Sequence, residues 1–424
     1  MRHRVFEFPS FGKAVFASLL CLGISGAQTL RSLAATRTNF HVGTAIGTRN
    51  ATVDSTLVRE FNAIVCENAM KFGSIMTGEN AYSYTSADNI INFGNSRGMY
   101  VRGHNFIWHK QMPAWFSATT YNPSRDSTFR LMKKYITNVM THFKGKINEW
   151  DIVNEAVARD SAGMRLGTGA NPSDQNLKWA LLTDAPNHDN DYLDSAFTYA
   201  RRADSSVLLV YNDYDCEGMG KKSGFVYNVV SHLKSKNLVD VIGLQCHFYA
   251  GSSTSGSNGA WVPTEMVENL KRLAALGLKI SLTEVDIRVA TSPAPDSVLL
   301  NKQKTAYQTL MSICLAQPGC NNFILWGIND GSSWVPGSFS GYGQALLFSD
   351  NTTNGAYTPK PTYYAVQAAM ISASTGILNA DHGRLKMIRS VNNDPRGLSF
   401  DLRGKRLTSI PYNPSFVARP LATR

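Results

Sequence analysis

The stretch WDIVNEAV, residues 150–157, decides the fold and the chemistry that this sequence predicts. Ile152 and Val153 are β-branched residues of the kind that favours a buried strand, and the polar end of the run places Asn154 and Glu155 side by side. An isolated Asn-Glu pair at a strand end is more often structural than catalytic. The pair therefore indicates a site only if a second carboxylate and further polar side chains converge on it.

Apolar runs of this kind recur along the chain, each followed by polar residues and then by a helical pattern. The runs that predict strands are His41–Gly47, Ile64–Met70, Met99–Trp108, Ile147–Ala156, Ser206–Tyr214, Val241–Tyr249, Lys279–Ile287 and Asn322–Asn329. Segments with helical periodicity are Ser127–Phe143, Leu193–Asp204, Gly224–Lys236, Thr264–Ala275 and Leu300–Leu315. Buried strands that alternate with amphipathic helices are typical of parallel βαβ units. The sequence thus predicts an α/β fold, a (β/α)₈ TIM barrel over residues 28–371 with a short C-terminal extension.

Polar and aromatic residues gather at the ends of these predicted strands. They are Glu67, Asn68, Lys71, His104, Trp108, Asn154, Glu155, Asn212, Asp213, Tyr214, Gln245, His247, Glu284, Asp286, Trp326 and Trp334. In a (β/α)₈ barrel the carboxyl ends of the strands meet at one face, where active sites lie. The set therefore predicts one site fed by several strands.

Two carboxylates stand out in this set. Glu284 ends the seventh predicted strand as Glu155 ends the fourth, so the two are expected to face each other over the barrel mouth. Opposed carboxylates about 5–5.5 Å apart cleave a glycosidic bond with retention of configuration. Glu155 is assigned as acid/base, in a partly desolvated position that keeps it protonated, with Asn154 beside it to bind the sugar 2-hydroxyl. Glu284 is assigned as nucleophile.

Other strand-end residues have supporting roles in this interpretation. His247 is expected to hydrogen-bond Glu284 through one ring nitrogen and Asp286 through the other, although a histidine at a strand end is more often structural. Lys71 and Asn68 are expected to donate to sugar hydroxyls, the alternative being a solvated lysine. The tryptophans Trp108, Trp326 and Trp334 are expected to form apolar platforms for sugar rings, the alternative being core packing.

The two ends of the chain differ from its centre. Residues 1–27 combine a basic start, a short apolar run and a small-residue cleavage site, which predicts a signal peptide and a secreted protein. No later run is long and apolar enough to predict a membrane span. Of the net charge of +11, the leader carries +2 and residues 372–424 carry +6, so the nearly balanced centre gives no support for a nucleic-acid partner. We expect a monomer.

The cysteines predict a disulfide and no metal site. Beyond the leader the chain has Cys66, Cys216, Cys246, Cys314 and Cys320, and no CxxC pair or Cys/His cluster has zinc spacing. Cys314 and Cys320 close a short Pro-Gly loop and are the best pair for a disulfide in an oxidising compartment. Neither a metal nor a cofactor is needed, because the two carboxylates supply the acid and the nucleophile.

Six strings together resemble a known family, the family 10 glycoside hydrolases, which are endo-1,4-β-xylanases. They are GHNFIWHKQMPAWF (103–116), WDIVNEA (150–156), NDY (212–214), GLQCHFY (243–249), SLTEVDI (281–287) and LWGINDGSSW (325–334). The resemblance implies hydrolysis of internal bonds of xylan, with Glu155 as acid/base and Glu284 as nucleophile. It implies that the sugar is bound by Glu67, Asn68, Lys71, His104, Trp108, Gln111, Asn154, Tyr214, Gln245, His247, Asp286, Trp326 and Trp334, with Tyr214 on the leaving-group side. The Cys314–Cys320 loop resembles a disulfide of many members.

Departures from the family pattern, and alternatives, remain open at this point. Cys66 stands where threonine is common and Phe72 where tryptophan often follows the lysine, and both are expected to border a sugar subsite; Lys110 replaces a common serine. The segment 372–424 lies outside the resemblance and is similar to secretion-sorting segments of some gliding bacteria. The alternative functions are another barrel glycosidase, such as a cellulase, and a non-catalytic sugar-binding barrel, which would lack one of the carboxylates.

Overall fold

The computed structural model describes residues 28–158, 163–165, 179, 191–251 and 261–374. The predicted signal peptide, residues 1–27, lies outside this range, as does the predicted C-terminal extension beyond Ser374. Within it, no helix is both long enough and apolar enough to cross a membrane.

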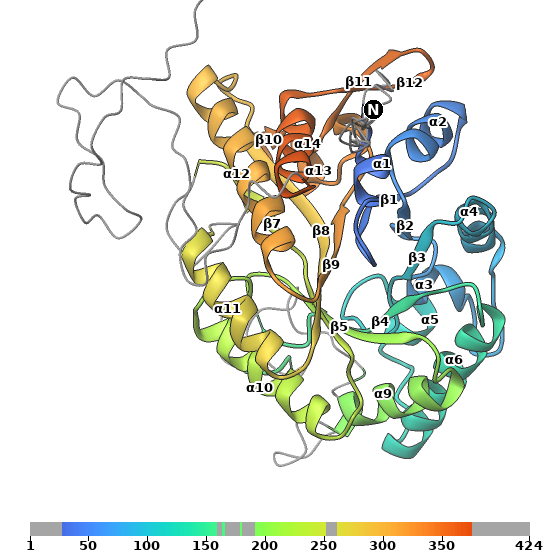
Figure 1. The fold of residues 1–424 in the computed structure, drawn as a ribbon. Coiled ribbons are helices and arrows are strands. Elements are labelled where there is room, and N and C mark those ends of the chain that lie inside the picture. The colour runs from blue at the N-terminus through green and yellow to red at the C-terminus, as the bar shows by residue number, and fades with distance from the viewer. Residues whose placement is uncertain (1–27, 159–162, 166–178, 180–190, 252–260, 375–424) are drawn as a thin grey trace, which may run out of the picture. The chain divides into compact units, whose positions relative to one another are not determined.

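Parallel strands closed into a barrel form the centre of the fold (Figure 1). Their bounds are β1 His41–Ile46, β2 Ala63–Cys66, β3 Tyr100–Gly103, β4 Glu149–Asn154, β5 Leu208–Asp213, β6 Val241–Leu244, β7 His247–Tyr249, β8 Lys279–Ala290 and β9 Cys320–Leu325. Each strand from β1 to β5 pairs with the next, β6 and β7 both pair with β8, and β8 pairs with β9. Pairing of β9 with β1 closes the ring. The predicted (β/α)₈ barrel is confirmed.

Helices surround these strands (Figure 1). They are α1 Leu30–Ala34, α2 Ala51–Glu60, α3 Phe72–Ile75, α4 Thr85–Asn95, α5 Ala114–Ser117, α6 Arg125–His142, α9 Asp191–Ala203, α10 Lys221–Ser235, α11 Pro263–Ala275, α12 Ser297–Ala316, α13 Val335–Ser338 and α14 Pro361–Ser374, with a 3₁₀ turn η1 at Asp330–Ser332. All five predicted helices are present. Helix α12 begins before the predicted Leu300 because the Asp296 carboxylate accepts the Leu299 N–H at 2.8 Å and caps it.

Short antiparallel strands follow β9 in the chain. Strand β10, Tyr342–Gly343, pairs with β8, and strands β11, Phe348–Thr353, and β12, Ala356–Pro359, form a hairpin. The predicted disulfide is present, because Cys314 and Cys320 are bonded. The three other cysteines of the described residues are free and buried.

The barrel interior is polar on the β4 side. Arg102 Nη2 pairs with Asp151 at 2.6 Å, and Arg102 Nε pairs with Glu149. Glu149 also accepts hydrogen bonds from Ser281 on β8 and Asn322 on β9, neither of which is a neighbour of β4 in the sheet. These contacts cross the barrel, so alternate β4 residues point inward. They leave Arg102 with charged partners on two sides, as a buried cation requires.

The opposite face of β4 packs outward against helices and aromatic rings. Trp150 is buried, with ring centroids 4.6 Å from Phe106 and 6.1 Å from Phe143. A Cβ at Gly103 would lie 2.1 Å from the Trp150 ring, so only glycine fits that position of β3. The outward residues of the opening stretch therefore serve packing, and its last residues serve the site.

Several predicted strands end earlier than expected, such as Ile64–Met70, where β2 stops at Cys66, and two are interrupted within their predicted range. The run Val241–Tyr249 is not continuous: β6 ends at Leu244 and β7 begins at His247, because Cys246 has a left-handed φ of +61°. The run Met99–Trp108 keeps its ladder only to Gly103, with one further bridge from Ile107 to Val153. In both places the strand is interrupted where side chains turn toward the barrel mouth.

Candidate active site

Both predicted catalytic carboxylates lie at the carboxyl end of the barrel. Glu155 directly follows β4 with a left-handed φ of +58°, and Glu284 lies within β8. Their exposed fractions are only 7 % and 4 %. Two buried carboxylates in one site interact strongly with whatever surrounds them, and their surroundings differ.

His247 contacts both Glu284 and Asp286, as predicted. His247 Nε2 lies 3.3 Å from Glu284 Oε2, and its Nδ1 lies 2.9 Å from Asp286 Oδ2. Burial lowers the pKa of His247, but Asp286 and Glu284 raise it more, to about 10. His247 is therefore a cation at neutral pH, and it faces the Glu284 carboxylate. Trp334 Nε1 donates to the same Asp286 oxygen at 2.7 Å, which fixes that carboxylate in turn.

Glu155 has a different set of neighbours. Gln245 Nε2 donates to Glu155 Oε1 at 3.1 Å, and His109 Nδ1 lies 3.7 Å from Oε2. Burial raises the pKa of Glu155, but His109, the Trp108 N–H and Gln245 outweigh burial and hold it at about 2. The expected protonated Glu155 is thus wrong for this structure, because the sequence does not show that His109 stands beside the carboxylate.

Asn212, a predicted strand-end residue without an individual role, links Glu284 to Asn154. Asn212 Nδ2 donates to Glu284 Oε1 at 2.7 Å and lies 2.8 Å from the Asn154 amide. Thr283 Oγ1 donates to Asn212 Oδ1 at 2.6 Å and fixes its orientation. The signal was present in the NDY string at the end of the fifth predicted strand.

A second group of predicted residues lies together beside Glu284. Lys71 is 6 % exposed, so it is not a solvated lysine. Its Nζ donates to Asn68 Oδ1 at 2.9 Å and lies 4.8 Å and 6.0 Å from the ring centroids of Trp108 and Trp326. Gln111 Nε2 also donates to Asn68 Oδ1, at 3.2 Å. The arrangement offers hydrogen-bonding groups next to aromatic rings, as a sugar site requires.

His104 is held by a carboxylate of the barrel interior. Its Nδ1 lies 2.8 Å from Asp151 Oδ2, and Arg102 binds the other oxygen of that carboxylate. The His104 ring contacts Trp326 edge to face, with centroids 4.9 Å apart. This chain of contacts connects the polar interior of the barrel to the site.

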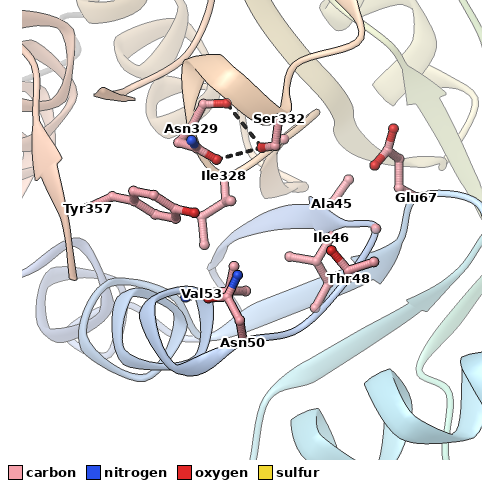
Figure 2. A pocket seen from close by; sticks show the side chains of 12 residues that line it. Ala45, Ile46, Thr48, Asn50, Val53, Glu67, Ile328, Asn329, Ser332 and Tyr357 are labelled. Carbon is pink, nitrogen blue, oxygen red and sulfur yellow. Dashed lines mark hydrogen bonds between the residues drawn. The ribbon is translucent and has the colours of Figure 1, made fainter. Parts of the chain in front are cut away.

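Glu67 stands between this group and a cavity of about 260 Å³ (Figure 2). The cavity is lined by Ala45, Ile46, Gly47, Thr48, Asn50, Val53, Glu67, Gly327, Ile328, Asn329, Ser332 and Tyr357. Figure 2 shows Glu67 at one end and Tyr357 at the other. Burial raises the pKa of Glu67. Glu67 is the one charged residue of this lining, so the cavity suits neutral polar groups.

Tyr214 lies on the other side of Glu155. Arg165 donates through Nη2 to the Tyr214 hydroxyl at 2.8 Å and through Nε to the Glu155 carbonyl at 2.7 Å. Lys222 Nζ lies 3.4 Å from the Tyr214 ring centroid and 2.8 Å from Asp213 Oδ1. Two cations thus fix the tyrosine. No pattern in the sequence indicates a role for Arg165.

Two expected subsite residues are instead part of the core. Cys66 ends β2 and is buried, and Phe72 is buried with its ring centroid 4.6 Å from Tyr135 and 5.1 Å from Trp179. Both side chains belong to the main hydrophobic core, and Phe72 lies in a cluster of aromatic rings, so neither is exposed to a sugar subsite. Among the described residues, no group of three His, Cys, Asp or Glu side chains is placed to hold a metal ion.

Paired carboxylates with separate supports, at the carboxyl end of a (β/α)₈ barrel, define the class of the barrel glycosidases. Residues 30–369 match the sequence profile of Glycosyl hydrolase family 10. The chain belongs to this family.

Characterised relatives agree with the family. Endo-1,4-beta-xylanase B of Thermotoga neapolitana is 34 % identical over 362 residues, which cover 82 % of this chain and 94 % of the relative. The crystal structure of native xylanase 10B from Thermotoga maritima has a TM-score of 0.71 at 33 % identity, covering 82 % of this chain and 99 % of that one. Xylanase 10B from Thermotoga petrophila RKU-1, in complex with xylobiose, has a TM-score of 0.70 at 33 % identity, covering 82 % and 98 %.

Proposed function

We propose that this protein is a retaining endo-1,4-β-xylanase that hydrolyses internal β-1,4-xylosidic bonds of xylan by double displacement. The observation that carries the proposal is the unequal support of two buried carboxylates. Glu284 faces the His247 cation, which suits a nucleophile that must stay ionised. Glu155 faces neutral donors and His109, on the side of the site where Tyr214 lies.

In the first step, Glu284 attacks the anomeric carbon while Glu155 gives its proton to the leaving glycosidic oxygen. In the second, Glu155 takes a proton from a water molecule, which attacks the same carbon and releases Glu284. A bound sugar removes water from Glu155, and this strengthens the effect of burial that already raises its pKa. Substrate binding therefore favours the protonated form that the first step needs.

The remaining residues bind and orient the sugar in this proposal. Asn154 hydrogen-bonds the 2-hydroxyl of the attacked xylose, and Trp108, Trp326 and Trp334 contact its apolar faces. The next sugar on the non-reducing side is bound by the group around Lys71, namely Glu67, Asn68 and Gln111. Tyr214 contacts the sugar on the leaving-group side. Gln245 and His104 orient the two carboxylates and the rings around them.

The proposals for location and assembly rest on the sequence. We propose that residues 1–27 are removed on export, that residues 28–371 fold as the catalytic domain, and that residues 372–424 serve sorting or tethering. The Cys314–Cys320 disulfide supports an oxidising, extracellular setting. The proposed protein is a monomer.

Release of reducing sugar from xylan, compared with carboxymethylcellulose, tests the substrate. We expect clear preference for xylan, because the site resembles that of xylanases in every motif around Glu155 and Glu284. Preference for carboxymethylcellulose would favour the alternative, a cellulase on the same barrel. Activity on neither polymer would favour a non-catalytic sugar-binding barrel.

A further inference from the structure

A two-residue break in the barrel wall carries contacts to both catalytic carboxylates. Gln245 and Cys246 lie between β6 and β7, and His247 is the first residue of β7. Gln245 donates to Glu155, and His247 contacts Glu284 and Asp286. The conformation of this turn therefore determines where Gln245 meets the acid/base Glu155 and where His247 meets the nucleophile Glu284.

The backbone of the turn cannot be fixed by the sheet alone. The β5–β6 ladder ends with the pair Asp213 and Leu244, and the Gln245 N–H still reaches the Asp213 carbonyl at 3.0 Å. The next residue, Cys246, is buried and has a left-handed φ, and its N–H lies beyond the last residue of β5. A buried N–H needs an acceptor, and a non-glycine residue keeps a left-handed φ only when its surroundings impose it.

A side chain supplies that acceptor. Glu217 Oε1 accepts the Cys246 N–H at 2.8 Å. Glu217 is 4 % exposed and belongs to the loop between β5 and α10, so it approaches the turn from outside the β6–β7 segment. It takes the place that a carbonyl of β5 would have if the ladder continued.

The loop that carries Glu217 is itself anchored. Asn269 on α11 donates through Nδ2 to the carbonyls of Cys216, at 2.7 Å, and Glu217, at 3.0 Å. Arg272, one turn further along α11, donates to Asn269 Oδ1 at 2.7 Å. The chain of hydrogen bonds therefore runs from an outer helix to the turn, and it holds Glu217 in one position.

We propose that Glu217 is a positioning residue for the reaction, which holds the Cys246 turn so that Gln245 and His247 meet Glu155 and Glu284. The inference rests on the proposed function of these two carboxylates. Glu217 touches neither the sugar nor the reacting atoms. It acts through the backbone of Cys246.

The charges around Glu217 are compatible with this role. Burial raises the pKa of Glu217 to about 7, Asp215 adds to the effect, and the Cys246 N–H and Lys222 oppose it. The buried thiols of Cys216 and Cys246 are the other titratable groups near it. Because either protonation state keeps an oxygen that accepts the N–H, a glutamine at this position preserves the contact.

Three substitutions test the proposal. Glu217→Gln keeps the acceptor, Glu217→Asp keeps the charge but shortens the side chain, and Glu217→Ala removes both. We expect the glutamine variant to retain kcat within about twofold, whereas the aspartate and alanine variants lose roughly ten- to a hundredfold, since small misplacements of catalytic groups cost this much. The aspartate variant covers the case in which the alanine variant does not fold.

Two readouts separate positioning from mere stability. On the acidic side of the pH–rate profile, the aspartate and alanine variants are expected to lose activity at higher pH than the wild type, because the His247 cation no longer faces the Glu284 carboxylate. By NMR, the pKa of His247 is expected to fall from about 10 by about one unit or more. Val139→Ala, a buried change on α6, is the control: it lowers the melting temperature and moves neither readout.

Unchanged His247 titration and an unchanged acidic limb in the aspartate and alanine variants would overturn the proposal, and so would a glutamine variant as impaired as alanine. The NMR readout needs no substrate. If the wild-type protein does not cleave xylan, the proposed function fails, and the titration of His247 still decides the role of Glu217.

Discussion

The two glutamates of the site are chemically identical residues whose roles are set by their neighbours. Glu284 is held by Asn212 and by a histidine whose pKa is raised to about 10, and Glu155 is held by Gln245 and His109. The sequence predicted that both glutamates lie at the carboxyl end of the barrel and that His247 contacts Glu284 and Asp286, because strand ends of a barrel converge. It did not predict the low pKa of Glu155, because the position of His109 depends on a loop conformation.

Removal of each carboxylate is expected to affect different steps. Glu284→Ala abolishes turnover of all glycosides, since no nucleophile remains. Glu155→Ala lowers kcat on xylan by about 10²–10⁴ but keeps the first step on aryl xylobiosides with activated leaving groups, which need no proton. Burst kinetics on such substrates measure this, with the exposed Glu268→Ala as control. Equal loss of the burst in both variants would contradict the assigned roles.

His109 is expected to control the basic limb of the pH profile. It is the first of the interactions that lower the pKa of Glu155 against burial, so His109→Asn raises that pKa. Proton donation is lost as the pH rises through the pKa of Glu155, and the variant therefore keeps activity on xylo-oligosaccharides to a higher pH, by about one unit. Activated aryl substrates serve as internal control, since their first step needs no proton. A basic limb that stays in place or moves to lower pH would refute this role.

At the scale of elements, the sequence predicted which segments are strands and helices but not where they stop. Periodicity located every barrel strand, because buried strands are continuous apolar runs. The break at Cys246 escaped prediction because its acceptor, Glu217, comes from a different loop. Phe72 was placed beside a sugar by analogy with the family, and the structure packs it against Tyr135, a contact between distant segments that no local pattern reveals.

The Cys314–Cys320 disulfide ties the end of α12 to β9 and lies apart from the catalytic carboxylates. It closes a loop with a sequence separation of 6, for which chain entropy gives about 2 kcal/mol of stability. The double variant Cys314→Ala, Cys320→Ala is expected to lose about that much unfolding free energy in urea titrations while kcat stays the same. A large loss of kcat in the folded variant would show that the loop shapes the site.

At the scale of the whole molecule, composition separates the parts of the chain. The excess of positive charge lies in residues 1–27 and 372–424, and the family match covers residues 30–369. The last described helix, α14, continues to Ser374, slightly beyond the predicted end of the catalytic domain, and it packs against α12 and α1. Every residue assigned to the site lies before that helix.

A chain of residues 28–374 is therefore expected to carry the full activity. Since no site residue is removed, kcat and KM on xylan should agree with those of the exported full-length protein within about twofold. The melting temperature, measured in parallel, controls for folding. A truncated chain that folds but loses activity would show that residues beyond 374 contribute to catalysis.

The most direct test of the central claim is covalent trapping with an activated 2-deoxy-2-fluoro-xylobioside, followed by mass spectrometry of the intact protein and its peptides. The fluorine slows both steps, and the activated leaving group restores the first, so the glycosyl-enzyme accumulates. The account predicts one added glycosyl group, on the peptide that contains Glu284, and no trapping in Glu284→Ala. A label on Glu155, or a protein that turns over without any covalent adduct, would contradict it.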